Sequence, residues 1–138
     1  MNLTVQPVDV AYLHLVWPEV EPFLIPALER SAGEATVDQI KVYLIDGRND
    51  LLVVIDEHNK IHGALIVQFN NYPNLREAFI VAIGGKFIAD RGAWAHFEVW
   101  AKRKGASVVR GQAYESVARL WRRAFGFTNR YVVVEKIL

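Results

Sequence analysis

The residues best suited to do chemistry lie in the segment IGGKFIADRGAWA, where glycines and basic residues lead into a helix. Backbone N–H groups at a helix N-terminus attract anions, and the helix dipole strengthens that attraction. Lys86 and Arg91 add positive charge beside these groups. A phosphate bound to this segment would lie against Gly84, Gly85, Lys86, Arg91, Gly92 and Ala93. The structural alternative is that Gly84 and Gly85 form a turn and Gly92 is a helix N-cap.

Other chemistry-bearing side chains are scattered. The two tyrosines near the last helix, Tyr114 and Tyr131, carry hydroxyl groups, although each is also explained as a packed aromatic with its hydroxyl at the surface. The histidines stand at positions 14, 58, 62 and 96. His58 and His62 flank a turn and a strand, and no third ligand completes a metal site with them. The sequence contains no GxSxG, Walker or HExxH motif.

The N-terminal third must contain helices despite its prolines. Proline inside a helix removes a hydrogen bond and clashes with the preceding turn. With prolines at 18, 22 and 26, we expect a short strand at LTVQPV, a short helix to about Trp17 and a second, irregular helix ending near Arg30. Thr36 and Gln39 match a capping box. They predict a further helix, whose apolar face includes Ile45 and which Gly47 ends.

The rest of the chain alternates strands and helices. The runs LLVVI, IHGALIVQFN and LREAFIVAI, joined by short polar turns, predict an antiparallel meander. A helix, AWAHFEVWAKRKG, leads to a fourth run, ASVVRGQ, which should pair in parallel with the last meander strand. The final helix should bury Trp121 and Phe125 and stop at Gly126, before a strand that runs to the C-terminus. The order predicts one α/β domain over residues 1–138, with a mixed, mostly antiparallel sheet flanked by helices.

Composition narrows the class of protein. Hydrophobic residues make up 52% of the chain and charged residues 22%, which indicates a folded core. The net charge of +1 is interspersed along the chain, so nucleic acid is not an expected partner. Cysteine is absent, which excludes disulfides and thiolate metal sites and fits a reducing compartment. Without a signal-peptide pattern or a long apolar run, we expect a cytoplasmic protein with no membrane span.

The last quarter, YESVARLWRRAFGFTNRYVVVEKIL, resembles the closing segment of the GNAT acetyltransferase superfamily, which often ends in a helix, an aromatic-rich "GF" and a terminal strand. The order of the expected elements is similar to that of the GNAT fold. More narrowly, Gly84-Gly85, Trp94, Trp100 and the terminal EKIL resemble small GNAT-like proteins of tailed phages. The resemblance implies acetyl-CoA as the cofactor, no metal, and a pyrophosphate bound between Gly84 and Ala93.

The resemblance also implies a general acid, usually a Tyr four residues before the Gly of "GF", that protonates the departing CoA thiolate. That position holds Arg122, which cannot give up its proton at neutral pH. Tyr114 and Tyr131 are therefore the candidate catalytic substitutes. The glycines of the phosphate segment also depart from the family's spacing. The family's base is often a Glu, and Glu77 and Glu98 are both candidates.

Two functions follow from these departures. The first is a phage-type GNAT-fold protein with a degenerate acetyl-CoA site, which acts by binding a protein partner, either in the virion or as an effector of proteins in the host cytoplasm. The alternative is an active acetyl-CoA-dependent N-acetyltransferase that acts on an unidentified amine. The two differ in the gap between the fourth and fifth strands. In an enzyme it admits pantetheine, and in a binding module it is filled, most simply by Phe87, Ile88 or Trp94.

Overall fold

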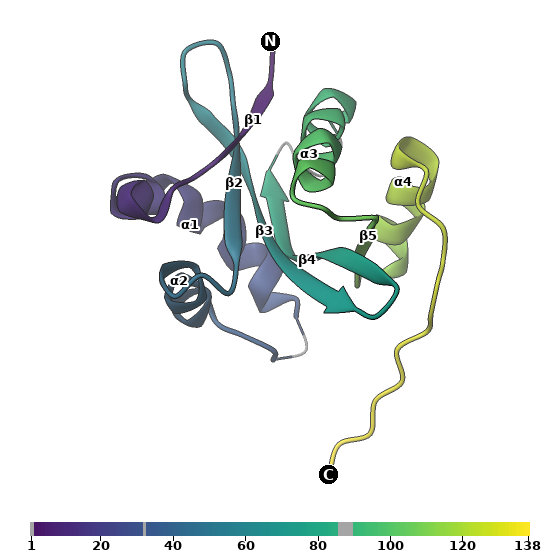
Figure 1. The fold of residues 1–138 in the computed structure, drawn as a ribbon. Helices are drawn as coiled ribbons and strands as arrows, with labels where there is room; N and C mark the ends of the chain where they lie inside the picture. The colour runs from purple at the N-terminus through teal and green to yellow at the C-terminus, as the bar shows by residue number, and fades with distance from the viewer. Residues whose placement is uncertain (1, 32, 86–89) are drawn as a thin grey trace.

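The chain folds into three layers, with a five-stranded sheet between two pairs of helices (Figure 1). The computed structural model describes residues 2–31, 33–85 and 90–138. In chain order the elements are β1 (Thr4–Pro7), a 3-10 turn η1 (Val10–Tyr12), α1 (Leu13–Glu29), α2 (Val37–Ile45), β2 (Asp50–Ile55), β3 (Ile61–Tyr72), β4 (Leu75–Gly85), α3 (Arg91–Arg103), β5 (Val108–Gly111) and α4 (Glu115–Phe125).

The sheet has the order β1-β2-β3-β4-β5. Its first four strands are antiparallel to their neighbours, and β4 and β5 are parallel. The predicted α/β fold class, with its mixed and mostly antiparallel sheet, is therefore confirmed. The parallel ladder is short, because it runs only from the pair Glu77–Val108 to the pair Ile80–Gly111. Beyond it β4 continues to Gly85 without β5 beside it.

Each face of the sheet has its own core, because successive side chains of a strand point to opposite faces. Helices α1 and α2 cover one face, where Leu24 and Ile40 pack with Leu51 and Ile66. Helices α3 and α4 cover the other face, where Trp94 and Phe97 pack with Leu52 and Trp121 among others. The sheet thus separates two apolar clusters that draw on different helices.

Helix α1 is one continuous helix of 17 residues, so the predicted break near Trp17 is wrong. Its three prolines, Pro18, Pro22 and Pro26, are four residues apart and all lie on the exposed face. The carbonyl groups that lose their helical donors therefore face water, which can replace the missing hydrogen bonds. Trp17, Val20 and Leu24 lie on the opposite, buried face and hold the helix against the sheet.

Several local predictions are confirmed. Thr36 and Gln39 form the complete capping box of α2, with the Gln39 N–H donating to Thr36 Oγ1 at 3.3 Å and the Thr36 N–H donating to Gln39 Oε1 at 2.9 Å. Gly126 ends α4 in the left-handed region, with φ of 74°. Trp121 is buried and Phe125 is half-buried in the same apolar cluster. Ile45, expected on the buried face of α2, is exposed instead.

The predicted terminal strand is absent, because nothing pairs with residues 128–138 in the described part of the chain. Phe127 packs against Trp94 and Trp121, and the chain then leaves the body of the protein and runs past the β3–β4 end of the sheet (Figure 1). Strand propensity is satisfied only by a neighbouring strand, which this segment does not have here. Among the residues that the structure describes, no helix is long and apolar enough to cross a membrane.

Candidate functional site

The two glycines of the predicted phosphate segment are the last residues of β4, so the interpretation of Gly84-Gly85 as a turn is wrong. Gly84 lies directly under α1, and a Cβ added there would overlap the backbone carbonyl oxygen of Phe23. Gly85 has φ of 72°, which favours glycine. Both glycines are therefore explained by backbone packing. Lys86 lies outside the described residues, as do Phe87 and Ile88.

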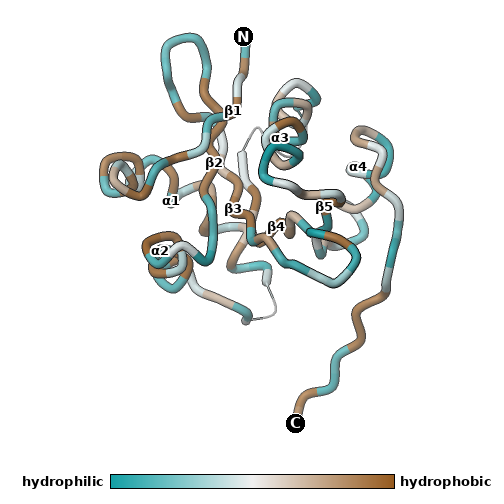
Figure 2. Tube along the Cα trace, viewed as in Figure 1, coloured by the Kyte–Doolittle hydropathy of each residue, from teal (hydrophilic) through white to brown (hydrophobic). Residues whose placement is uncertain are grey.

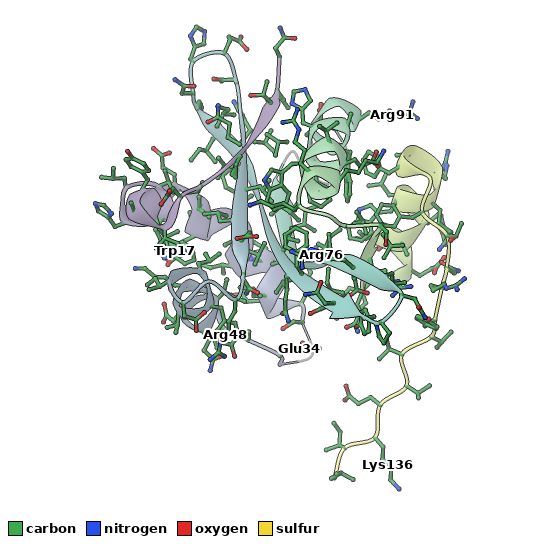
Figure 3. All side chains as sticks on the ribbon, viewed as in Figure 1. Trp17, Glu34, Arg48, Arg76, Arg91 and Lys136 are labelled. Atoms are coloured by element: carbon green, nitrogen blue, oxygen red, sulfur yellow. The ribbon has the colours of Figure 1, made fainter. Side chains whose placement is uncertain are left out.

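Helix α3 carries its own anion at its N-terminus. Asp90 is the N-cap, and its Oδ2 accepts a hydrogen bond from the Ala93 N–H at 2.8 Å. The N-cap position predicted for Gly92 is therefore wrong, because Gly92 lies inside the first turn. Arg91 is exposed and extends outward from the start of the helix (Figure 3). A carboxylate cap satisfies the dipole and stabilises a helix typically by about 1 kcal/mol.

This carboxylate is the main argument against a pyrophosphate at the same place. Asp90 already uses the Ala93 N–H, and its negative charge would lie beside those of a bound phosphate. Two like charges a few ångströms apart destabilise one another. At the start of α3, a diphosphate would therefore compete with the Asp90 carboxylate for the Ala93 N–H.

An aromatic cluster covers the point at which β5 leaves β4. The Trp94 ring is buried, and its centroid lies 4.6 Å from that of Phe125 and 5.8 Å from that of Trp121. A Cβ added to Gly111, the last residue of β5, would lie 3.1 Å from the Trp121 ring. Aromatic side chains thus pack against the end of the parallel ladder on the α3–α4 side of the sheet.

Arg122, at the position where the resembled family has its acid, is held in polar contacts. Its Nη2 donates to Glu115 Oε1 at 2.6 Å, and its Nη1 donates to Asn129 Oδ1 at 2.7 Å. The hydrogen bond from Arg122, and then its positive charge, lower the pKa of Glu115. The guanidinium therefore ties the start of α4 to the segment that follows it, which the sequence did not indicate.

The two candidate tyrosines lie in different places. The Tyr114 hydroxyl donates to the Arg30 carbonyl oxygen at 2.8 Å, so it joins the start of α4 to the end of α1. Tyr131 lies in the C-terminal segment, where its ring centroid is 5.9 Å from the Arg110 guanidinium. Both residues are largely exposed, at 64% for Tyr114 and 74% for Tyr131, so neither is packed as the alternative interpretation expects. The fold does not bring them together with the start of α3 in any described contact.

A large hollow lies elsewhere, along the outer edge of β5. It has a volume of about 1190 Å³ and opens widely to solvent. Its walls are the β3–β4 hairpin, β5 with the turn after it, one side of α4, and residues 127–133. Tyr131 lines it, whereas Tyr114, Gly84, Gly85 and residues 90–93 are not among the described residues that line it.

A buried polar cluster forms part of this hollow's wall. Glu77 is only 5% exposed. Its Oε1 accepts a hydrogen bond from Asn70 Nδ2 at 2.8 Å, and its Oε2 accepts one from Arg110 Nη1 at 3.2 Å. Glu77 is thus buried and hydrogen-bonded, whereas Glu98, the other candidate base, lies on an exposed side of α3. The sequence separates Glu77 from Arg110 by 33 residues, and only the parallel ladder brings them together.

The described residues contain no cluster of potential metal ligands. In residues 2–31, 33–85 and 90–138, no three His, Asp or Glu side chains come together as a metal site. His62 Nε2 lies 2.8 Å from Asp56 Oδ2, but this is a pair at the β2–β3 turn with no third ligand.

Comparison with solved structures identifies the fold. An aminoglycoside acetyltransferase from an uncultured soil metagenomic sample, in complex with sisomicin, superposes with a TM-score of 0.72, at 14% identity over 99% of this chain and 96% of that one. A GCN5-related N-acetyltransferase from Ralstonia eutropha gives 0.63 at 16% identity, with 99% of each chain covered. A ribosomal-protein-alanine N-acetyltransferase from Brucella melitensis gives 0.64 at 15% identity and 99% coverage of both chains.

These similarities establish the GNAT fold over nearly the whole chain. At these identities they concern the fold alone. By sequence, no family model matches the chain, and no curated protein matches it significantly.

Proposed function

We propose that this chain is a GNAT-fold binding protein in which the acetyl-CoA site has been lost. The observation that carries the proposal is the hydrogen bond from the Ala93 N–H to the Asp90 carboxylate, which is 2.8 Å long and closes the first turn of α3. Two further observations support it: Trp94 is packed into an aromatic cluster, and Arg122 is bound to Glu115. The partner we propose is a protein, in a virion or in a host cytoplasm, in line with the resemblance to GNAT-like proteins of tailed phages.

The test is calorimetric titration of the full chain with acetyl-CoA. The proposal expects no saturable heat, because a pyrophosphate would have to displace or neutralise Asp90. The matched variant is Asp90→Ser, which keeps a capping oxygen and removes the charge. Saturable binding of acetyl-CoA to the wild-type chain would overturn the proposal. Equal binding by Asp90→Ser would then show that the carboxylate is not a barrier.

The second candidate is an active acetyl-CoA-dependent N-acetyltransferase, and two observations favour it. β4 extends beyond the end of β5, and a buried carboxylate, Glu77, lies on β4 beside a large hollow. In this case the amides between Gly84 and Ala93, with Lys86 and Arg91, are the proposed phosphate contacts. The double variant Lys86→Ala/Arg91→Ala should then weaken acetyl-CoA binding.

Turnover separates the two candidates. The assay is CoA release with a panel of amines that includes aminoglycosides, polyamines and protein N-termini. The binding-protein proposal expects transfer to be weak or absent, since a positioned general acid contributes on the order of 10²–10⁴-fold to such a reaction. Robust turnover that is abolished by Tyr114→Phe or Tyr131→Phe would restore the enzyme and assign its acid.

A further inference from the structure

The two helix layers of the fold carry opposite charge, which corrects the expectation that the charges are interspersed. Residues 1–50, which include α1 and α2, contain eight acidic and three basic residues. Residues 91–138, which include α3 and α4, contain three acidic and ten basic residues. These two pairs of helices lie on opposite sides of the largely hydrophobic strands β2 and β3 (Figure 2). The net charge of +1 therefore conceals a strongly dipolar molecule.

The exposed face of α1 presents a row of hydrogen-bond acceptors. Six exposed residues at helical spacing form this face: Leu15, Pro18, Glu19, Pro22, Pro26 and Glu29. Each proline lacks an N–H, so the carbonyl oxygens of His14, Pro18 and Pro22 lose their helical donors. Successive carbonyls of this row are about 6 Å apart along the axis, since each helical residue rises about 1.5 Å. With two glutamates beside the row and no Lys or Arg within α1, the face is acidic.

The exposed face of α4 carries donors with the same repeat. Arg119 and Arg123 are exposed and lie four residues apart, on the side of α4 opposite to the buried Trp121. Their spacing along the helix axis is therefore also about 6 Å. Arg122 is engaged with Glu115, whereas neither Arg119 nor Arg123 forms an ion pair or a side-chain hydrogen bond within the described structure. Two guanidinium groups thus remain available for a partner.

The exposed faces of α1 and α4 cannot meet within one chain. The two helices pack on opposite sides of the sheet, so these faces point in opposite directions. The ends of the helices do meet, where the Tyr114 hydroxyl donates to the Arg30 carbonyl oxygen at 2.8 Å. This contact leaves both exposed faces turned outward, so a contact between them requires two molecules.

We propose that the exposed face of α4 in one copy docks on the exposed face of α1 in a second copy. The guanidinium groups of Arg119 and Arg123 donate to the row of carbonyl oxygens, while Glu19 and Glu29 supply the opposite charge beside it. The aliphatic stems of the arginines lie on the prolines and on Leu15, which is 64% exposed.

The occupant is a second copy because both matched surfaces belong to the same chain. They agree in repeat, in charge and in the kind of hydrogen-bonding group. A nucleic acid would engage the basic face but would leave the acidic α1 face without a partner. Since the contact joins two different surfaces, each copy keeps one free face of each kind, and association can continue head to tail.

The first measurement is sedimentation equilibrium of the full chain at low and high salt. At low salt, the proposal expects a mean mass that rises with concentration above the 15.7 kDa of one chain. The Debye length falls from about 10 Å at 0.1 M salt to about 3 Å at 1 M, so association should weaken strongly at 1 M. A chain that stays monomeric at low salt at all concentrations overturns the proposal, whether or not it binds a DNA duplex.

The second measurement exchanges the charges of the two faces. Arg119→Glu/Arg123→Glu makes the α4 face acidic, and Glu19→Arg/Glu29→Arg makes the α1 face basic. Each variant alone should associate at least about tenfold more weakly than the wild-type chain, because attractive contacts become repulsive. An equal mixture of the two variants should regain association, because the acidic α4 face of one meets the basic α1 face of the other. A mixture that associates as weakly as the separate variants overturns the proposal.

The matched control is Lys102→Glu/Arg103→Glu, which makes the same change of charge on exposed residues of α3. This variant should keep most of its association, because α3 is not part of the contact. A loss as large as that of the α4 variant would assign association to the overall dipole and overturn the contact between α4 and α1.

Pro18→Ala/Pro22→Ala tests the carbonyl row without changing any charge. The variant returns N–H donors to the carbonyl oxygens of His14 and Pro18, so association should weaken several-fold. Removing prolines from a helix interior favours the helix, so the variant should melt at the same or a higher temperature. Undiminished association would overturn the role of the carbonyl row.

All of these variants should fold, because the substituted residues lie outside both apolar clusters. Thermal melts at 1 M salt, where association is weak, check this point. None of the readouts uses acetyl-CoA, so their outcome is separate from that of the proposed function.

Discussion

Asp90 and Ala93 are joined by a hydrogen bond of 2.8 Å from the Ala93 N–H to the Asp90 carboxylate, which closes the first turn of α3. This hydrogen bond therefore has two effects, one on the stability of the helix and one on anion binding at its N-terminus. It stabilises the helix, and it places a negative charge where the resemblance to GNAT acetyltransferases implies a bound diphosphate. The choice of Asp, in place of a neutral capping residue, adds a negative charge at the start of α3.

The first prediction separates these two roles. Asp90→Ala should lower the free energy of unfolding by about 0.5–2 kcal/mol, because the cap is lost. Asp90→Ser should retain most of the stability and remove the charge. Chemical denaturation measures both variants. If Asp90→Ala is as stable as the wild-type chain, the hydrogen bond is not an effective cap.

The second prediction concerns the aromatic core on the α3–α4 face. Trp121→Ala should cost about 3–5 kcal/mol of stability, because the ring is 4% exposed and packs against Trp94 and Phe127. Tyr131→Ala is the matched control, since its ring is 74% exposed, and it should change stability by less than about 0.5 kcal/mol in the monomer. Thermal melts of the two variants should therefore differ clearly, and equal melting temperatures would contradict the assignment.

The third prediction is that Gly84 tolerates no side chain. Gly84→Ala should destabilise the chain by roughly 1–3 kcal/mol or more, because the new Cβ would overlap the Phe23 carbonyl oxygen. The obstacle is backbone, so the double variant Gly84→Ala/Phe23→Ala should not recover stability. Recovery in the double variant would show that the Phe23 side chain, and not the α1 backbone, sets the limit.

The fourth prediction is a loss of stability in acid. The His62 side chain donates a hydrogen bond to Asp56, and the Lys60 and His58 N–H groups donate two more; together they lower the pKa of Asp56 from 3.8 to about 2. A carboxylate whose pKa is lower in the folded state stabilises the fold above its unfolded pKa. This contribution should be complete above about pH 4 and lost as the pH falls toward 2. Urea denaturation across that range should show it, and Asp56→Asn should remove it. An unchanged pH profile in Asp56→Asn would assign the acid sensitivity to other groups.

Local patterns predicted local structure well. The capping box of Thr36 and Gln39 and the glycine stop at Gly126 involve residues within one turn of each other, and both are confirmed. The prolines of α1 misled because the rule against helical proline considers one residue at a time. Their common spacing of four residues places them together on the exposed face, where proline destabilises a helix least.

Features that depend on distant partners were not predictable. The sequence did not single out Glu77, because only the parallel ladder places Arg110 beside it. The predicted terminal strand does not form, because strand propensity alone does not provide a neighbouring strand. Asp90 is the exception, because an Asp three residues before Ala93, at the start of an amphipathic helix, is a readable N-cap signal. The sequence therefore indicated the elements of the candidate site more reliably than its contacts.

The four-residue ladder between β4 and β5 has a consequence for the motions of the fold. The unit formed by β5 and α4 is attached to the rest of the fold by this ladder, by the side chains around Trp121, and by two further hydrogen bonds, from Arg110 to Glu77 and from Tyr114 to the Arg30 carbonyl. By contrast, β2 and β3 lie between neighbours on both edges and helices on both faces. Cooperative opening begins where burial and backbone pairing are least. Residues 108–125 should therefore detach as a unit, at a lower free energy than global unfolding. Their amide protons should exchange with solvent well before those of Leu52–Val54 and Ala64–Val67. Local opening of the molecule is therefore expected to separate β5 from β4.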